Sequence, residues 1–254
     1  MTTESQPTAE QRRTERDAAS WAKPVGRLKI TTVPEGAVAY TVEGRRLTSP
    51  VQGFGWLWQK TFRVRLEGAS VSPTELIATW KQHFSEFWPR GNRFYEPLAG
   101  IAPGEIALLS VSTGVPLKLS TGIMVLYADD ESFTFMTPEG HMLAGWITFS
   151  ANRDADVTVA QAQVLVRASD PLYELGMIAM MGRVEDRFWH NTLTALARHF
   201  NVDRPVESQI VCVDRRWQWS NVGNIRYNAG IRIGLHLLGA PVRVAMRPFR
   251  RTRG

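Results

Sequence analysis

The chain has little cysteine and no long apolar run, and both scarcities limit what kind of protein it can be. Cys212 is the only cysteine among the 254 residues, so the chain cannot form an internal disulfide framework. No stretch approaches the roughly 18 apolar residues that a membrane-spanning helix needs, and residues 1–17 lack the apolar core of a signal peptide. We therefore expect a cytoplasmic protein in a reducing compartment.

The sequence also lacks the short motifs that mark nucleotide, metal and hydrolase sites. It contains no glycine-rich phosphate loop, no paired zinc-ligand spacing, no Gly-x-Ser-x-Gly elbow and no His-Glu-x-x-His pair. Its five histidines are dispersed along the chain. We therefore expect no metal and no cofactor, and a binding protein is favoured over an enzyme.

Acidic residues become scarce toward the C-terminus. Residues 1–200 carry 20 Lys/Arg and 21 Asp/Glu, a net charge of −1, whereas residues 201–254 carry 10 Arg and 3 Asp/Glu, a net charge of +7. Such a basic end can bind phosphate in lipid headgroups or in nucleic acid. A solvated tail is the alternative, and nucleic acid is disfavoured because residues 215–219 carry no RNA-binding signature. We expect a peripheral contact with an anionic membrane through Arg243, Arg247, Arg250, Arg251 and Arg253.

The longest helical pattern spans residues 170–201 and begins with a clear start signal. Asp170 is expected to be the N-cap and Pro171 the first helical residue. Glu185, Thr192 and His199 project near the middle of the apolar side, where a polar group needs a partner. That apolar side is one broad arc made of Leu175, Ile178, Met181, Val184, Phe188, Trp189, Leu193, Ala195, Leu196 and Phe200.

Ahead of this helix, the apolar pattern predicts a strand, a helix and a meander of strands. A strand is expected over residues 60–67, followed by a helix that opens with the capping box at 72–75. Short turns separate five further strands, which makes neighbouring strands antiparallel. They are expected over residues 106–112, 117–127, 132–137, 142–150 and 157–168.

Composition divides the chain into four parts. Residues 1–20 are polar without apolar periodicity and are expected to be disordered. Residues 21–52 are an irregular lead-in, and residues 53–201 form the main domain. Residues 202–254 are a basic extension with one helix, expected over 222–238.

The order strand, helix, antiparallel meander and long helix resembles the START-like (SRPBCC) helix-grip superfamily. That group contains lipid-transfer START domains, the birch pollen allergen and aromatic polyketide cyclases. The stretches SFTFMTPEGH at 132–141, GWITF at 145–149 and SDPLY at 169–173 resemble a bacterial branch of unknown function. The resemblance covers residues 60–200 and implies an α+β fold, in which a curved antiparallel sheet grips the long helix around a cavity for an apolar molecule. It implies no particular reaction.

The predicted site is a cavity between the sheet and the long helix, and its expected partner is a hydrophobic small molecule or lipid. Glu185 is the central candidate, because a carboxylate on an apolar arc either pairs with a cation such as Arg167 or Lys118 or binds a ligand hydroxyl. The alternative function is a cyclase- or hydrolase-type enzyme with Glu185 or His141 as acid/base. Small residues on the last strand allow either close packing or room for a ligand. The expected lining is Met181, Glu185, Phe188, Thr192, His141, Ala160, Ala162 and Val164.

Overall fold

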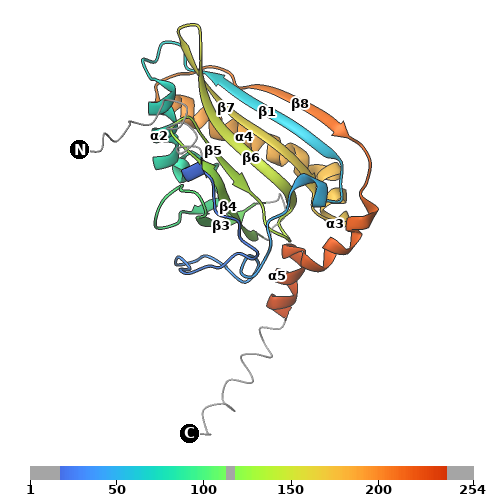
Figure 1. Ribbon diagram of the computed structural model, residues 1–254. Helices are drawn as coiled ribbons and strands as arrows, with labels where there is room; N and C mark the ends of the chain where they lie inside the picture. Colours follow the sequence, from blue (N-terminus) through green and yellow to red (C-terminus); the bar gives the residue numbers. More distant parts are fainter. Residues whose placement is uncertain (1–17, 113–117, 239–254) are drawn as a thin grey trace, which may run out of the picture.

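The computed structural model describes residues 18–112 and 118–238, except for the side chains of Met180, Met181 and Leu237. The arginines predicted to meet a membrane, at 243–253, lie outside the described residues. Eight strands form one antiparallel sheet in the order β2-β3-β4-β5-β6-β7-β1-β8 (Figure 1). The strands are β1 (Leu57–Arg65), β2 (Arg93–Tyr95), β3 (Ile106–Val111), β4 (Leu119–Ala128), β5 (Ser132–Met136), β6 (Leu143–Asp154), β7 (Val157–Ala168) and β8 (Glu207–Asp214).

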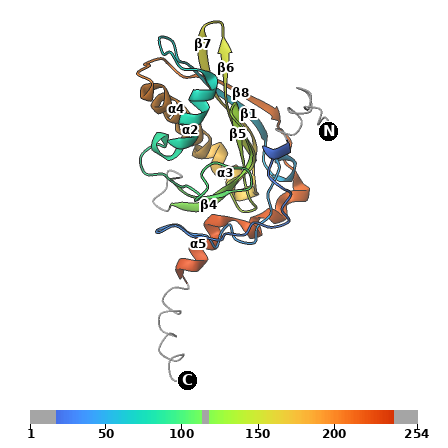
Figure 2. The same ribbon diagram turned by 60° about the vertical axis from the view of Figure 1, so that its left-hand side comes forward.

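Helices cover one face of this curved, open sheet. In α2, Ser72 Oγ accepts a hydrogen bond from Glu75 N at 3.2 Å, and Glu75 Oε2 accepts one from Ser72 N at 2.8 Å, which is the predicted capping box. Figure 2 shows α2 and α4 on the same side of the sheet. The helices are α2 (Pro73–Gln82), α3 (Pro171–Gly176), α4 (Gly182–His199) and α5 (Ala229–Leu238), with a π turn, η3 (Met177–Met181), and 3-10 segments at Pro50–Gln52, Phe84–Phe87 and Trp219–Tyr227.

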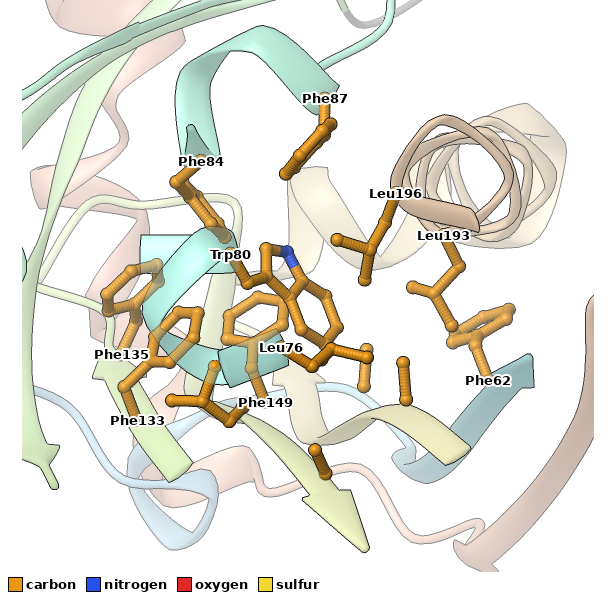
Figure 3. Close-up of a cluster of buried hydrophobic side chains, with 14 of the residues drawn as sticks. Phe62, Leu76, Trp80, Phe84, Phe87, Phe133, Phe135, Phe149, Leu193 and Leu196 are labelled. Carbon is orange, nitrogen blue, oxygen red and sulfur yellow. The ribbon is translucent and has the colours of Figure 1, made fainter. Parts of the chain in front are cut away.

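The main core fills the space between the sheet and these helices. Trp80 of α2 packs edge-to-face against Phe133 and Phe149, with ring centroids 6.0 and 5.1 Å apart. Leu193 and Leu196 of α4 point into the same cluster (Figure 3). Burying each such side chain contributes roughly 1.5–3 kcal/mol. The α+β helix-grip arrangement that the sequence predicts is therefore confirmed.

The long helix starts as predicted, but its buried side does not follow one regular helical repeat from end to end. Asp170 Oδ1 caps it by accepting hydrogen bonds from Leu172 N and Tyr173 N. The π turn then adds one residue to the helix, which rotates everything before it by about 100° relative to a regular α-helix. Consequently Tyr173 and Glu174 are buried, whereas Leu175 and Ile178 are 63% and 55% exposed. The prediction that these last two share the buried arc was wrong.

The lead-in covers the other face of the sheet. Leu28 and Val42 form a second, separate hydrophobic cluster with Leu108 of β3 and Met124 of β4. Its backbone also pairs with the sheet, because Ala22 N donates to Leu126 O at 2.9 Å. The lead-in has few regular elements, yet it shields the outer side of β3 and β4 from water.

The extension after α4 adds β8 beside β1 and then crosses to α3. Its helix was predicted over 222–238, but α5 begins at Ala229 because Asn228 is its cap. Asn228 Oδ1 accepts from Ile231 N at 3.0 Å, while its Nδ2 donates to Asp170 Oδ2 at 2.8 Å. One hydrogen bond thus joins the caps of α3 and α5.

Candidate ligand cavity

A cavity of about 130 Å³ lies between the sheet and α4, and its lining is almost entirely apolar. The walls come from the segment after α2, from strands β2 to β7 and from α4. The aromatic residues of this lining come from segments that are far from one another in the sequence. The lining residues are Trp88, Asn92, Phe94, Leu109, Val111, Ser112, Ile123, Phe135, Thr137, His141, Met142, Leu143, Trp146, Ile147, Val164, Val166, Val184, Glu185, Phe188 and Trp189.

Four of the expected lining residues are in this wall: His141, Val164, Glu185 and Phe188. The others lie elsewhere. Ala160 and Ala162 are fully buried in the main core together with Leu193 and Leu196 of α4, so small residues here serve close packing of helix and sheet. Thr192 is also fully buried, and its Oγ1 donates to Phe188 O at 2.9 Å. The side chain of Met181 lies outside the described residues.

Sequence reasoning missed most of the aromatic wall. Trp88 precedes, and Phe94 lies within, a loop rich in glycine and proline at residues 90–104. This loop has no apolar period, so no pattern indicated which way the two side chains point. Trp146 was missed for another reason, since alternation along β6 assigns it to the face opposite Leu143 and Ile147. The cavity therefore depends on side chains whose positions are set by tertiary contacts.

Glu185 lies at the cavity wall in a buried ionic cluster. Lys60 Nζ lies 2.7 Å from Glu185 Oε2 and 2.6 Å from Asp186 Oδ1. Lys60 is only 3% exposed, and it points to α4 because it shares the inward face of β1 with Phe62. The alternation along β1 could have identified this lysine, because it stands two residues before Phe62.

The predicted cation partners of Glu185 were wrong. Arg167 instead donates to Gly55 O at 2.6 Å and to Asp214 Oδ2 at 2.7 Å, on the other face of β7. Lys118 is exposed beside β4. Side-chain direction alternates along a strand, so Arg167 could not lie on the same face as Val164 and Val166.

Charge balance in this cluster favours a protonated lysine. Burial by itself disfavours the charged form, but the carboxylates of Glu185 and Asp186 outweigh it and raise the pKa of Lys60. Among the described residues, Glu185 Oε1 has no hydrogen-bond partner although it is buried. Glu185 thus lines the cavity while one of its carboxylate oxygens is buried without a described partner.

His141 serves the turn between β5 and β6. Its Nδ1 lies 3.0 Å from Leu143 N, and Ser169 Oγ donates to its backbone oxygen. Burial lowers the pKa of His141 to about 4. The ring is therefore neutral near pH 7, which removes its use as a general acid and makes it a weak base.

The described part of the chain contains no group of three or more His, Cys, Asp or Glu residues placed to hold a metal ion. None of its helices has the length and apolar character needed to cross a bilayer.

Comparison with known proteins adds resemblance at the level of architecture. No family model and no curated protein matches the chain. Among solved structures, Ara h 8.0201 is 11% identical over 57% of this chain and 98% of its own, with a TM-score of 0.41. Protein Ms6760 from Mycobacterium smegmatis is 10% identical over 61% of this chain and 96% of its own, with a TM-score of 0.41. The di-domain ARO/CYC StfQ from the steffimycin biosynthetic pathway is 11% identical over 57% of this chain and 50% of its own, with a TM-score of 0.43. The helix-grip fold of this chain is evident from its own strand order and from α4 lying against the sheet.

Proposed function

We propose that the chain binds an apolar small molecule that carries one hydrogen-bond donor, such as a hydroxyl group. The observation that carries this proposal is the Glu185 carboxylate, which has a buried oxygen without a described partner in an apolar wall. Leaving a buried acceptor unsatisfied costs roughly 1–3 kcal/mol. A ligand hydroxyl at this oxygen would recover much of that free energy.

The size and chemistry of the cavity suit a molecule with one ring or a short chain. An engineered apolar cavity of about 150 Å³ in another protein stays dry and binds benzene, and the cavity here measures about 130 Å³. Trp88, Phe188 and Trp189 present ring edges and faces to one another at centroid distances of 5.0 and 4.8 Å. Aromatic walls of this kind bind apolar ligands through burial of their surface.

Lys60 and Asp186 keep Glu185 available for a ligand. Because Lys60 already binds Glu185 Oε2, the carboxylate has its counter-ion and is held in place. Asp186 also binds Lys60 but does not line the cavity. The two carboxylates therefore share a cation, and only one of them is placed to contact a ligand.

The test compares 4-ethylphenol with ethylbenzene, which has the same shape but no hydroxyl group. We expect 4-ethylphenol to bind at least about tenfold more tightly by isothermal titration calorimetry, because a hydrogen bond to a charged group contributes roughly 1.5–3 kcal/mol. Glu185→Gln should remove most of this preference and leave ethylbenzene binding unchanged.

Asp186→Asn is the matched control, because it also takes one carboxylate from Lys60 but leaves the cavity wall intact. It should preserve the preference for the phenol. Equal affinities of the native chain for the two compounds, or an equal loss of preference in both variants, would refute the role given to Glu185.

A further inference from the structure

Helix α5 has apolar side chains on two opposite sides, and only one side is covered. Ala229 and Ile233 are buried against a cluster that includes Leu119 and Tyr173. Ile231, Leu235 and Leu238 repeat at helical spacing on the opposite side, where Leu235 and Leu238 are 64% and 78% exposed. Within the described part of the chain, nothing covers this second stripe.

A second exposed apolar stripe lies on α3 and the start of the π turn η3. Leu172, Leu175 and Ile178 recur every third residue and face solvent because of the π turn. Trp217 and Trp219, both exposed, stand beside α3, since Trp217 Nε1 donates to Glu174 Oε1 at 3.2 Å. Single exposed apolar residues are common, but several on adjoining elements indicate an interaction surface.

Direct contacts hold α3 and α5 together at one end of the molecule. Gly230 N, at the start of α5, donates to Tyr173 Oη of α3 at 3.1 Å. Asn224 Nδ2 donates to Ser169 O, just before α3, at 2.9 Å. In Figure 1, α3 and α5 lie at the same end of the molecule. We call this region the α3–α5 end, comprising α3, residues 217–227 and α5.

The part of the chain that follows Asp214 carries charge of one sign. After Asp214 the sequence contains no Asp or Glu, and the only ionised side chains apart from histidine are arginines. Arg215, Arg216 and Arg226 are exposed within the described part. The arginines that follow α5 begin at Arg243, five residues after Leu238, and continue to Arg253. An apolar surface flanked by exposed arginines is complementary to an anionic bilayer.

We propose that the α3–α5 end docks on an anionic lipid bilayer. The exposed leucines and tryptophans enter the boundary between headgroups and acyl chains, and the arginines bind lipid phosphates. Val111 and Met142 line the cavity and also pack against the hydrophobic cluster to which Ala229 and Ile233 of α5 belong. The buried side of α5 is thereby connected to the cavity wall, although the proposal does not depend on what the cavity binds.

The apolar part of the proposal is tested with Leu235→Asn/Leu238→Asn in the full chain. Flotation would compare vesicles of phosphatidylcholine alone with vesicles that also contain phosphatidylglycerol. We expect the native chain to float with the anionic vesicles and the double variant to partition about tenfold less, because two apolar side chains are lost from the interface. Leu98→Asn is the matched control, since Leu98 is 91% exposed in the loop after β2, and it should float like the native chain.

The cationic part is tested with Arg215→Gln/Arg226→Gln and with added salt. The double variant should reduce flotation with the anionic vesicles because it removes two positive charges. Added salt should reduce it as well, because salt screens charges beyond about 8 Å at physiological ionic strength.

Equal recovery with neutral and anionic vesicles would overturn the proposal. The proposal would also be overturned if the native chain were a dimer that does not float and Leu235→Asn/Leu238→Asn made it a monomer. A second copy of the chain would then occupy this surface. Unchanged flotation of the leucine variant would overturn the proposal as well.

Discussion

At the scale of single residues, two buried titratable groups show two ways to meet the cost of burial: Lys60, which pairs with Glu185, and His141, which lines the cavity. Lys60 stays charged because two carboxylates lie within 2.7 Å of its ammonium group. His141 has no such counter-ion among its described partners and is held neutral by burial. The first arrangement fixes α4 to β1, and the second makes the stability of the turn between β5 and β6 sensitive to acid.

We predict that His141 weakens the fold below neutral pH. Its pKa of about 4 in the folded chain lies below the ordinary value of 6.5, so the unfolded chain takes up a proton first as the pH falls. This group should remove about 2 kcal/mol of unfolding free energy between pH 7 and pH 5, and little more below pH 4. Urea unfolding at both pH values should show a smaller decrease for His141→Asn. The same decrease in the two proteins would contradict the prediction.

At the scale of elements, the π turn determines which side chains α3 offers to the core. It shifts α3 by one residue relative to α4, so Glu174 and Tyr173 face inward and meet Trp217 and Gly230 of the extension. A regular α-helix of the same sequence would bury Leu175 and Ile178 instead. The π turn thereby places polar groups where the C-terminal extension docks, and apolar groups on the surface.

We predict that deleting Ala179 from the π turn is tolerated, because a regular α-helix one residue shorter keeps α3 and α4 in their present phases. The loss of unfolding free energy should stay below about 2 kcal/mol. Deleting Thr194 from α4 is the control, since it rotates Leu193 away from the phase of Leu196 and should cost at least about 5 kcal/mol. Circular dichroism during urea unfolding measures both. Similar losses would show that the π turn is not a one-residue insertion.

At the scale of the whole molecule, the lead-in and the described part of the extension, residues 202–238, are structural parts of the fold. The lead-in covers the outer face of β3 and β4, and the extension supplies an edge strand, the partners of Arg167 and the cover over α3. One close approach fixes the extension in place: Ala229 N donates to Gly140 O at 3.0 Å in the turn after β5. Gly140 has a φ of 88°, and a Cβ there would lie 2.2 Å from Tyr227 O.

We predict that Gly140→Ala detaches residues 219–238 from the domain. The substitution should lower the unfolding free energy by about 3 kcal/mol or more, because it combines left-handed backbone strain with a collision against Tyr227 O. Gly68→Ala separates the two effects, since Gly68 has a φ of 87° but open space around it, and it should cost only about 1–2 kcal/mol. Limited proteolysis should cut the Gly140→Ala extension first. Equal costs at the two positions would exclude the collision as the cause.

The sequence by itself determined the local features and the order of elements. The caps at Ser72 and Asp170 form within three residues of the side chains that make them, and the strands β3 to β7 follow from alternation between short turns. These features depend on backbone geometry and near neighbours, and they suffice for the α+β helix-grip architecture.

Only the tertiary structure decided the partners and the space between elements. Lys60 meets Glu185 across 125 residues of sequence, and no local pattern specifies such a pair. The π turn shifted the predicted arc of the long helix, and Asn228 moved the start of α5, because contacts across the fold overrode helical periodicity. The cavity is the space between sheet and helix that side chains such as Trp88, Trp146 and Phe188 line but do not fill. Whether such a space remains depends on how the side-chain volumes pack in three dimensions, which a hydrophobic pattern in the sequence does not specify.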